Sequence, residues 1–228
     1  MELETAEAPR RVQPSSTQLS VSVVIPVLNE EAALGKVLDD VRAAMEISGH
    51  PYEIIVVDDG STDGSREVLA RYAGRLTAVF QANQGYAAAF NAGFALSRGR
   101  IVCLLDADDV WLPGKLARVV RRFEAEPALS MVQHFLQDAD AGLSPLAVEF
   151  PIWPARTTLD DYLDGRAEFT ATSGLSLRRE TLAAALPLPV ALRFLYADDL
   201  LTVRALARGP SGNIAEPLGL HRVHGANF

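Results

Sequence analysis

Polar and mostly acidic side chains follow four short apolar segments of the 228-residue chain. They are Asn29, Glu30 and Glu31; Asp58 and Asp59; Asn83 and Gln84; and Asp106, Asp108 and Asp109. Carboxylates brought close together repel one another, and a bound cation is one way in which a protein relieves that repulsion. Lysine can supply little of this relief, because Lys36 and Lys115 are the only lysines in the chain. The pattern therefore indicates a cation-binding site.

The sharpest of these signals is the D-x-D motif formed by Asp106 and Asp108, directly after the apolar segment Ile101–Leu105. With one residue between them, both carboxylates can reach one hard cation, directly or through water. Mg²⁺ and Mn²⁺ take oxygen ligands and are commonly held by one or two carboxylates together with substrate phosphates. The motif thus predicts a diphosphate substrate. The alternative is that these acids cap the following helix and face solvent.

The elements that must position these side chains alternate between strands and helices. Nearly unbroken Val/Ile/Leu runs predict parallel strands covered on both faces, at Val21–Val27, Glu53–Val57, Leu76–Phe80 and Ile101–Leu105. Helical spacing of apolar residues predicts helices between them: one capped by Asn29 and closed by Gly49, then Ser65–Ala73, Tyr86–Ser97, and one that stops before Pro127. The fold class is therefore α/β with a mostly parallel central sheet and helices on both faces. Ligands of such sheets gather at the carboxyl ends of the strands, where the polar turns lie.

Beyond Ser130 the pattern loosens. It predicts strands at Met131–Phe135 and Leu175–Leu177, helices at Leu159–Leu163 and Asp198–Ala207, and an extended segment at Leu218–Val223. We expect a solvated, disordered tail over residues 1–18 and one domain over residues 19–228.

Composition excludes several classes of protein. The formal net charge is −8, whereas a protein that coats duplex nucleic acid needs a basic surface, so no nucleic-acid partner is expected. No apolar run approaches the roughly 20 residues of a spanning helix, and no signal peptide is visible, so we expect at most peripheral membrane contact. The single cysteine, Cys103, lies in an apolar run and fits a reducing, cytoplasmic location. The sequence predicts no oligomeric state.

Six short motifs in order resemble the family 2 glycosyltransferases, which have the GT-A fold. They are S-V-V-I-P-V-L-N-E-E at Ser22–Glu31, V-V-D-D-G-S-T-D at Val56–Asp63, N-Q-G-Y-A-A-A-F-N-A-G at Asn83–Gly93, D-A-D-D at Asp106–Asp109, A-D-D-L at Ala197–Leu200 and H-R-V-H-G-A-N at His221–Asn227. The resemblance covers Val21–Asn227. It implies a nucleoside-diphosphate-sugar donor and a Mn²⁺ or Mg²⁺ cofactor. It also implies that residues 19–228 form one GT-A catalytic domain, in which residues 19–126 would bind the nucleotide and residues 127–228 would supply the base and the acceptor surface.

The resemblance also implies which residues bind the nucleotide. The turn after the first strand, with Pro26, Leu28 and Glu30, would wrap the nucleoside, and Asp59 would accept a hydrogen bond from the base, usually uracil. The remaining nucleotide-binding candidates are Gln84, Gly85, Asp106 and Ala107. In the alternative interpretation, Asp58 and Asp59 merely turn the chain into the next helix.

A family 2 enzyme needs one carboxylate base, because the acceptor hydroxyl loses a proton while the metal stabilises the departing diphosphate. The resemblance matches the base to Asp198 and Asp199. We predict Asp199 as the base and Asp198 as a positioning or capping residue; alternatively, both acids serve only the helix dipole. His224 is a candidate metal ligand, with an ordinary hydrogen-bonded histidine as the alternative, and Arg222 could contact the diphosphate. Trp111 would wall the acceptor site or anchor its loop.

Two other functions compete with this one. In a haloacid-dehalogenase-like phosphohydrolase, Asp106 would be the phosphoryl nucleophile, but that fold places the nucleophile on its first strand and needs a later lysine than Lys115. A catalytically inactive nucleotide-binding module would keep the same fold. We predict a metal-dependent, inverting glycosyltransferase of hexosyl or N-acetylhexosaminyl type, with a UDP-sugar as the favoured donor. Its acceptor would be a glycan, a lipid-linked molecule or a small molecule.

Overall fold

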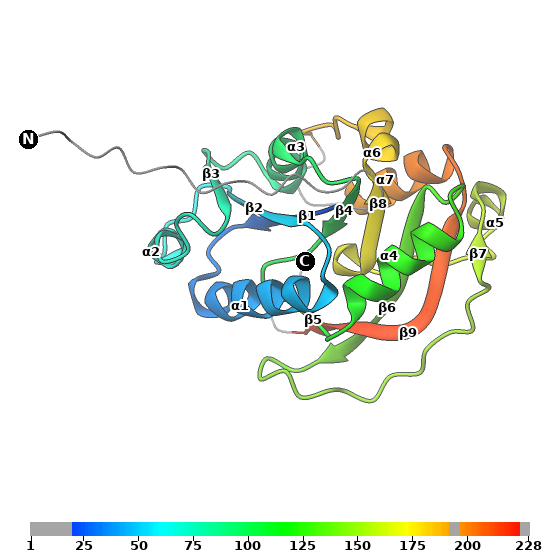
Figure 1. The fold of residues 1–228 in the computed structure, drawn as a ribbon, viewed down its shortest axis with the longest axis horizontal. Helices are drawn as coiled ribbons and strands as arrows, with labels where there is room; N and C mark the ends of the chain where they lie inside the picture. Colours follow the sequence, from blue (N-terminus) through cyan, green and yellow to red (C-terminus); the bar gives the residue numbers. More distant parts are fainter. Residues whose placement is uncertain (1–19, 192–196, 224–228) are drawn as a thin grey trace, which may run out of the picture.

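A mixed β-sheet runs through the middle of the molecule (Figure 1). The computed structural model describes residues 20–191 and 197–223. Within these residues the sheet has nine strands, in the order β3-β2-β1-β4-β8-β6-β9-β5, with β7 paired to β9 outside this path. The predicted tail at residues 1–18 and the candidate ligand His224 lie outside the described residues. The α/β class with a central multi-strand sheet is confirmed.

The four strands predicted in the first half are present and parallel. They are β1 (Val21–Val27), β2 (Tyr52–Asp58), β3 (Thr77–Phe80) and β4 (Ile101–Leu104). The later strands are β5 (Val110–Trp111), β6 (Met131–Ala139), β7 (Arg156–Thr157), β8 (Leu175–Arg178) and β9 (Ser211–Arg222). Because β8 is antiparallel to both β4 and β6, and β9 is parallel to β6, the carboxyl ends of β1–β4, β6 and β9 share one edge of the sheet.

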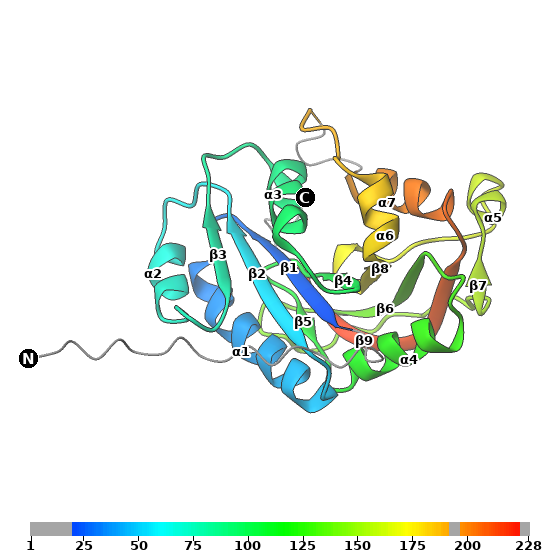
Figure 2. The same cartoon turned by 45° about the horizontal axis from the view of Figure 1, so that its top comes forward.

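Helices cover both faces of the sheet (Figure 2). Their bounds are α1 Glu31–Ser48, α2 Ser65–Ala70, α3 Tyr86–Leu96, α4 Lys115–Ala125, α5 Leu159–Leu163, α6 Arg179–Ala185 and α7 Ala197–Leu206. One buried cluster joins the sheet to α1, α2 and α4, with Met45 and Phe123 in it. A second joins the other face to α3, α6 and α7, through Phe90, Leu182 and Leu201. These two cores explain why β1 and β4 are apolar on both faces.

The start of α1 differs from the prediction. Asn29 does not cap the helix: it has a φ of +58°, and Glu30 occupies the N-cap position without a side-chain cap bond. Instead, the side chains of Ser61, Ser65 and Asp63 accept hydrogen bonds from the N–H groups of residues 29, 30 and 31, at 2.9 to 3.0 Å. The turn after β1 is therefore held by the turn after β2. At the other end, Gly49 closes α1 in the left-handed conformation, as predicted.

The second half contains more regular structure than the sequence predicted. Strand β6 extends four residues past the predicted end at Phe135, β9 begins at Ser211, and α6 was not predicted. Irregular pairing between β6 and β9 around Phe135 explains why the pattern was hard to recognise. In the described part of the chain, no helix is both long and apolar enough to cross a membrane.

Candidate active site

The D-A-D-D turn leaves β4 at the carboxyl edge of the sheet, and two distant segments hold it there. The Asp106 N–H donates to Ser173 Oγ at 3.0 Å, and Ser173 belongs to a short 3₁₀ turn, η1 (Thr172–Gly174). From the end of β9, Arg222 donates through its backbone N–H to Asp109 Oδ1 at 2.9 Å and through Nε to the Asp108 carbonyl at 2.8 Å. Arg222, a candidate for diphosphate contact, is thus a support of this turn.

Asp106 is the electrostatic centre of the site. Burial raises its pKa well above the usual range for a carboxyl group, and the negative charges of Asp109, Asp108, Asp198 and Glu30 raise it further. These four carboxylates come from the turn after β1, the D-A-D-D turn itself and the start of α7. The structure therefore places acids from separate parts of the sequence close enough to act on one another. A cation would relieve this repulsion.

The donors at this edge suit a hard cation that is held partly by its substrate. Asp106 and Asp108 are both partly buried and offer carboxylate oxygens, the ligand type that Mg²⁺ and Mn²⁺ prefer. Over residues 20–191 and 197–223, no three His, Cys, Asp or Glu side chains form a group that could hold a metal by themselves. A site with two protein carboxylates completed by water and phosphate oxygens fits both observations.

Asp59, the predicted base-binding residue, organises the loop before α3. It is 4% exposed, and its carboxylate accepts hydrogen bonds from Gln81 Nε2 at 2.7 Å, the Gln84 N–H at 3.0 Å and the Gly85 N–H at 2.7 Å. A carboxylate can accept about four hydrogen bonds, and the described part of the chain supplies three donors, which leaves room for one from a ligand. Contact with a base remains a prediction.

Backbone hydrogen bonds connect Asp59 to several of the other nucleotide-binding candidates. The Asp59 N–H donates to the Val27 carbonyl at 2.9 Å, which joins this loop to the turn that carries Leu28 and Glu30. Pro26, Leu28 and Glu30 are partly buried, Ala107 is buried, Gln84 is exposed, and Gly85 is buried at the N-cap of α3. Gly60 is required by close approach as well as by its φ of +87°, because a Cβ there would lie 2.7 Å from the Asn83 nitrogen.

The acidic pair at the start of α7 lies at the same edge. Asp198 Oδ1 accepts the Asp199 N–H at 3.0 Å, which is a local capping contact. The Asp198 charge also raises the pKa values of Asp106 and Tyr86, each already raised mainly by burial. Asp199 is exposed, and burial followed by the Asp198 charge raises its pKa. Asp198 therefore acts on Asp106, while Asp199 is exposed beside it, and its charge helps burial to raise the pKa of Tyr162.

Sequence reasoning did not find the residue that holds these parts together, Ser173. Its carbonyl accepts from Trp111 Nε1 at 3.2 Å and Lys115 Nζ at 3.1 Å, while its hydroxyl accepts from Asp106. Lys115 Nζ also lies 3.4 Å from the centre of the Trp111 ring. Trp111, at 3% exposure, anchors the turn. A single serine in T-S-G carries no sequence signal that could have revealed this role.

Comparison with known proteins identifies the family and agrees with the fold. The family model described as Glycosyl transferase family 2 matches residues 22–185, so the chain belongs to this family. An uncharacterized glycosyltransferase of Nostoc sp., alr2836, is 35% identical over 217 residues, which cover 92% of this chain and 66% of that protein. The undecaprenyl-phosphate 4-deoxy-4-formamido-L-arabinose transferase of Pseudomonas paraeruginosa is 45% identical over 107 residues, 45% of this chain and 32% of that protein. The chain thus spans about two thirds of the first relative and one third of the second.

Solved structures share the fold at low identity. TarS of S. aureus in complex with UDP has a TM-score of 0.70 and 19% identity, over 90% of this chain and 61% of that one. The mannosyltransferase PcManGT of Pyrobaculum calidifontis, in complex with GDP-Man and Mn²⁺, has a TM-score of 0.67 and 20% identity, over 97% of this chain and 62% of that one. Family membership does not favour a haloacid-dehalogenase-like phosphohydrolase.

Proposed function

We propose that the chain is a metal-dependent, inverting glycosyltransferase that moves a hexosyl or N-acetylhexosaminyl group from a nucleoside diphosphate sugar to an acceptor hydroxyl. The observation that carries the proposal is the convergence of Glu30, Asp108 and Asp198 on Asp106 at the carboxyl edge of the sheet. TarS and PcManGT, which share the fold, were solved with UDP and with GDP-Man and Mn²⁺. A UDP-sugar is the favoured donor, because the family resemblance implies that Asp59 binds the base, usually uracil, and because TarS was solved with UDP.

The residues divide the work between the donor and the acceptor. Asp106 and Asp108 would hold Mn²⁺ or Mg²⁺ against the diphosphate, and the bound ion would stabilise the charge of the leaving group. Because the diphosphate then needs no proton, a single base suffices. Asp199 would take the proton of the acceptor hydroxyl, and its raised pKa makes it a stronger base than an ordinary aspartate. Asp198 would orient the start of α7 through its hydrogen bond with the Asp199 N–H, and its negative charge would raise the pKa of Asp106.

The first test measures donor binding. UDP, GDP and dTDP are titrated by calorimetry with and without Mn²⁺, on the full chain and on Asp108→Ala. We expect metal-dependent binding of UDP that the Asp108→Ala variant loses. Glu124→Gln, an exposed acid on α4, is the matched control and should bind UDP like the original chain. Binding of UDP that does not respond to the metal would contradict the assignment of Asp106 and Asp108.

The second test separates the two acids of α7. With a donor that binds, turnover is followed as release of UDP, for Asp199→Asn and for Asp198→Asn. We expect Asp199→Asn to keep donor affinity and lose turnover, while Asp198→Asn changes donor affinity as well because it acts on Asp106. Normal turnover by Asp199→Asn would overturn its assignment as the base. Release of phosphate from a phosphomonoester would instead support the phosphohydrolase.

Location and acceptor are proposed on separate grounds. The buried, unpaired thiol of Cys103 supports a cytoplasmic location, because such a thiol suits a reducing compartment. The acceptor would be a glycan, a lipid-linked molecule or a small molecule. The relative whose name refers to undecaprenyl phosphate aligns with only 45% of this chain, so its acceptor cannot simply be transferred.

A further inference from the structure

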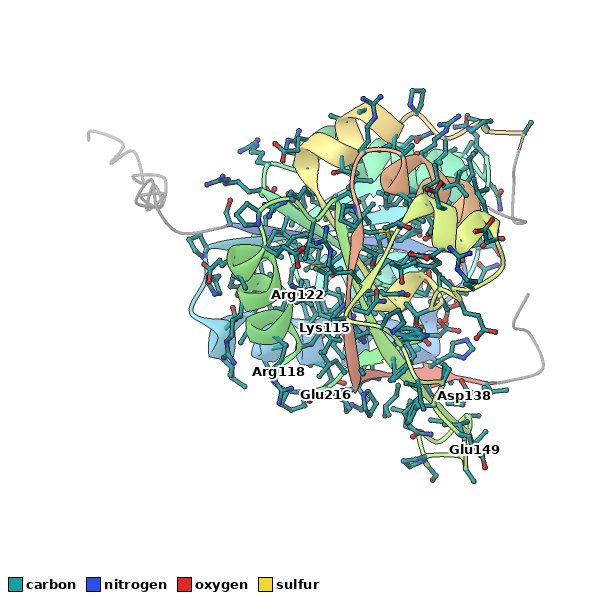
Figure 3. The ribbon with its side chains drawn as sticks, turned by 90° about the vertical axis from the view of Figure 1, so that its right-hand side faces the viewer. Lys115, Arg118, Arg122, Asp138, Glu149 and Glu216 are labelled. Atoms are coloured by element: carbon teal, nitrogen blue, oxygen red, sulfur yellow. The ribbon has the colours of Figure 1, made fainter. Side chains whose placement is uncertain are left out.

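A cleft of about 290 Å³ opens beside the candidate active site. Its walls come from the end of β6 (Phe135, Leu136 and Asp138), the connecting segment 148–153, and residues 168–170 before η1. Figure 3 shows Asp138 and Glu149 on the part of the chain that projects from the body of the molecule. Because β6 runs parallel to β4, this cleft lies at the same edge of the sheet as Asp106.

Aromatic rings form one wall of the cleft. Phe135 stacks on Phe150 with ring centroids 4.8 Å apart and contacts Trp153 at 4.1 Å. Phe150 is 36% exposed, so the aromatic wall can be reached from solvent. Trp153 Nε1 is buried and has no hydrogen-bond partner among the residues that the structure describes. An unsatisfied buried donor is uncommon and needs an explanation, which a bound ligand with oxygen atoms would give.

Acidic residues also line the cleft, beside Leu136, Val148, Pro151, Phe169 and Thr170. Asp138, Glu149 and Glu168 face the cleft, and none of the described residues that line it is a lysine or an arginine. Beside the cleft, His221 Nδ1 lies 3.0 Å from Asp138 Oδ1. Three negative charges disfavour a phosphate, a sulfate or an anionic lipid headgroup. They leave acceptor oxygens for a ligand that donates hydrogen bonds.

The cleft and the candidate active site share two pieces of backbone. Residue Thr170 in the cleft precedes Ser173, the support of Asp106, by three residues, a span of at most about 10 Å. Asp138 pairs with His221 in the β6–β9 register, and the next residue, Arg222, holds the D-A-D-D turn. Only one to three residues of backbone therefore separate the residues at the cleft from those that support the candidate active site.

We propose that this cleft binds a neutral saccharide, which is the acceptor of the transferase. Aromatic faces pack against the C–H faces of sugar rings, and carboxylates accept hydrogen bonds from pairs of sugar hydroxyl groups. The aromatic wall of Phe150 and Trp153 and the carboxylates of Asp138, Glu149 and Glu168 supply both kinds of contact. The inference deepens the proposed function, on which its acceptor role rests. A polyprenyl phosphate or a membrane surface would meet the wrong charge here.

The test uses the fluorescence of Trp153, which lines the cleft. The other tryptophan, Trp111, is 3% exposed and does not line the cleft, so a ligand there should leave its emission unchanged. Neutral oligosaccharides of glucose and N-acetylglucosamine, their sulfated forms and a short-chain polyprenyl phosphate are titrated into the full chain. We expect saturable quenching or a shift with a neutral oligosaccharide and none with the sulfated or phosphorylated probes. Phe150→Ala and Glu149→Gln should each weaken that binding about tenfold or more.

Ile152→Ala is the matched control, because Ile152 is 99% exposed in the same segment but does not line the cleft. It should bind the saccharide like the original chain. The inference is overturned if no neutral saccharide binds, if Phe150→Ala binds it unchanged, or if the polyprenyl phosphate binds in its place. UDP titration of the same variants separates the two proposals. The cleft variants should bind UDP like the original chain. If the original chain binds a neutral saccharide but not UDP, the proposed function is contradicted and the saccharide site is not.

Discussion

Replacing Lys115 with methionine should make the protein more stable at low pH. Lys115 is 0% exposed, and burial lowers the pKa of its ammonium group from 10.5 to about 7, although the nearby Cys103 and Asp109 act in the opposite direction. At 1.36 kcal/mol per pH unit, this difference corresponds to about 5 kcal/mol that the charged form loses on folding. Methionine has a similar length and carries no charge, so Lys115→Met removes this penalty.

The pH dependence gives the prediction its sign. Between pH 7 and pH 10.5 the unfolded chain keeps the Lys115 proton while the folded chain releases it. The unfolded state then binds more protons, so the free energy of unfolding of the original chain rises with pH in this window. Below pH 7 both states are protonated and the penalty is complete. The advantage of Lys115→Met should therefore be largest at pH 6, up to about 5 kcal/mol, and shrink by about 1.4 kcal/mol per pH unit above pH 7.

Urea denaturation at pH 6, 7, 8, 9 and 10 measures this difference, because all other titrating groups are common to both proteins. Lys36→Met is the control: the Lys36 side chain is 58% exposed and forms an exposed ion pair with Asp40, so its replacement should change stability by less than about 1 kcal/mol at every pH. A difference between Lys115→Met and the original chain that does not vary with pH would refute the reasoning. Lower stability of Lys115→Met at pH 6 would refute it too.

Three further predictions follow from buried contacts. Asp59→Asn replaces one carboxylate oxygen with a donor that faces N–H groups, so the free energy of unfolding should fall by about 1 to 3 kcal/mol, measured with urea. Gly99→Ala places a Cβ 2.4 Å from the Ser22 nitrogen and should lower stability by about 1 to 3 kcal/mol, whereas Gly35→Ala, with its nearest contact at 3.7 Å in a helix, should raise it by up to about 1 kcal/mol. Burial raises the pKa of the Cys103 thiol, so a thiol reagent should modify it only as fast as the chain unfolds.

Each of these has an outcome that would contradict it. An unchanged urea midpoint for Asp59→Asn would show that the loop before α3 does not depend on that carboxylate. Equal changes in the free energy of unfolding for Gly99→Ala and Gly35→Ala would show that the backbone at Ser22 can move to accommodate the new Cβ at low cost. Rapid labelling of Cys103 in the folded chain would show that β4 is not covered on both faces.

The first half of the fold could be predicted because its signals are local. Strands β1 and β4 are covered on both faces, so their apolar residues form unbroken runs, and the buried face of α1 repeats at helical spacing. The N-terminus of α1 could not be predicted in the same way. Its hydrogen-bond acceptors, Ser61, Ser65 and Asp63, lie more than thirty residues later, and only the folded chain brings them there.

The second half illustrates the opposite case. Strand β9 is twelve residues long, but Pro217 and irregular pairing with β6 interrupt its pattern, so only its end was predicted. The site shows the same division. Motifs placed Asp106, Asp108 and Asp198 at one edge, whereas Ser173, 67 residues from Asp106, is recognisable only from the hydrogen bonds it accepts.

The cost of burying Lys115 suggests what the residue contributes. A buried ammonium group that lowers stability by several kcal/mol is a poor stabilising device, and hydrophobic replacements of buried charges often raise stability. Its contacts lead to the site instead: Lys115 and Trp111 both donate to the Ser173 carbonyl, and the Ser173 hydroxyl accepts the Asp106 N–H. Lys115→Met leaves Trp111 as the only one of these two donors on that carbonyl. We therefore expect the variant that gains stability at pH 6 to bind UDP and Mn²⁺ less tightly, because a support of the D-A-D-D turn is lost while the fold is strengthened.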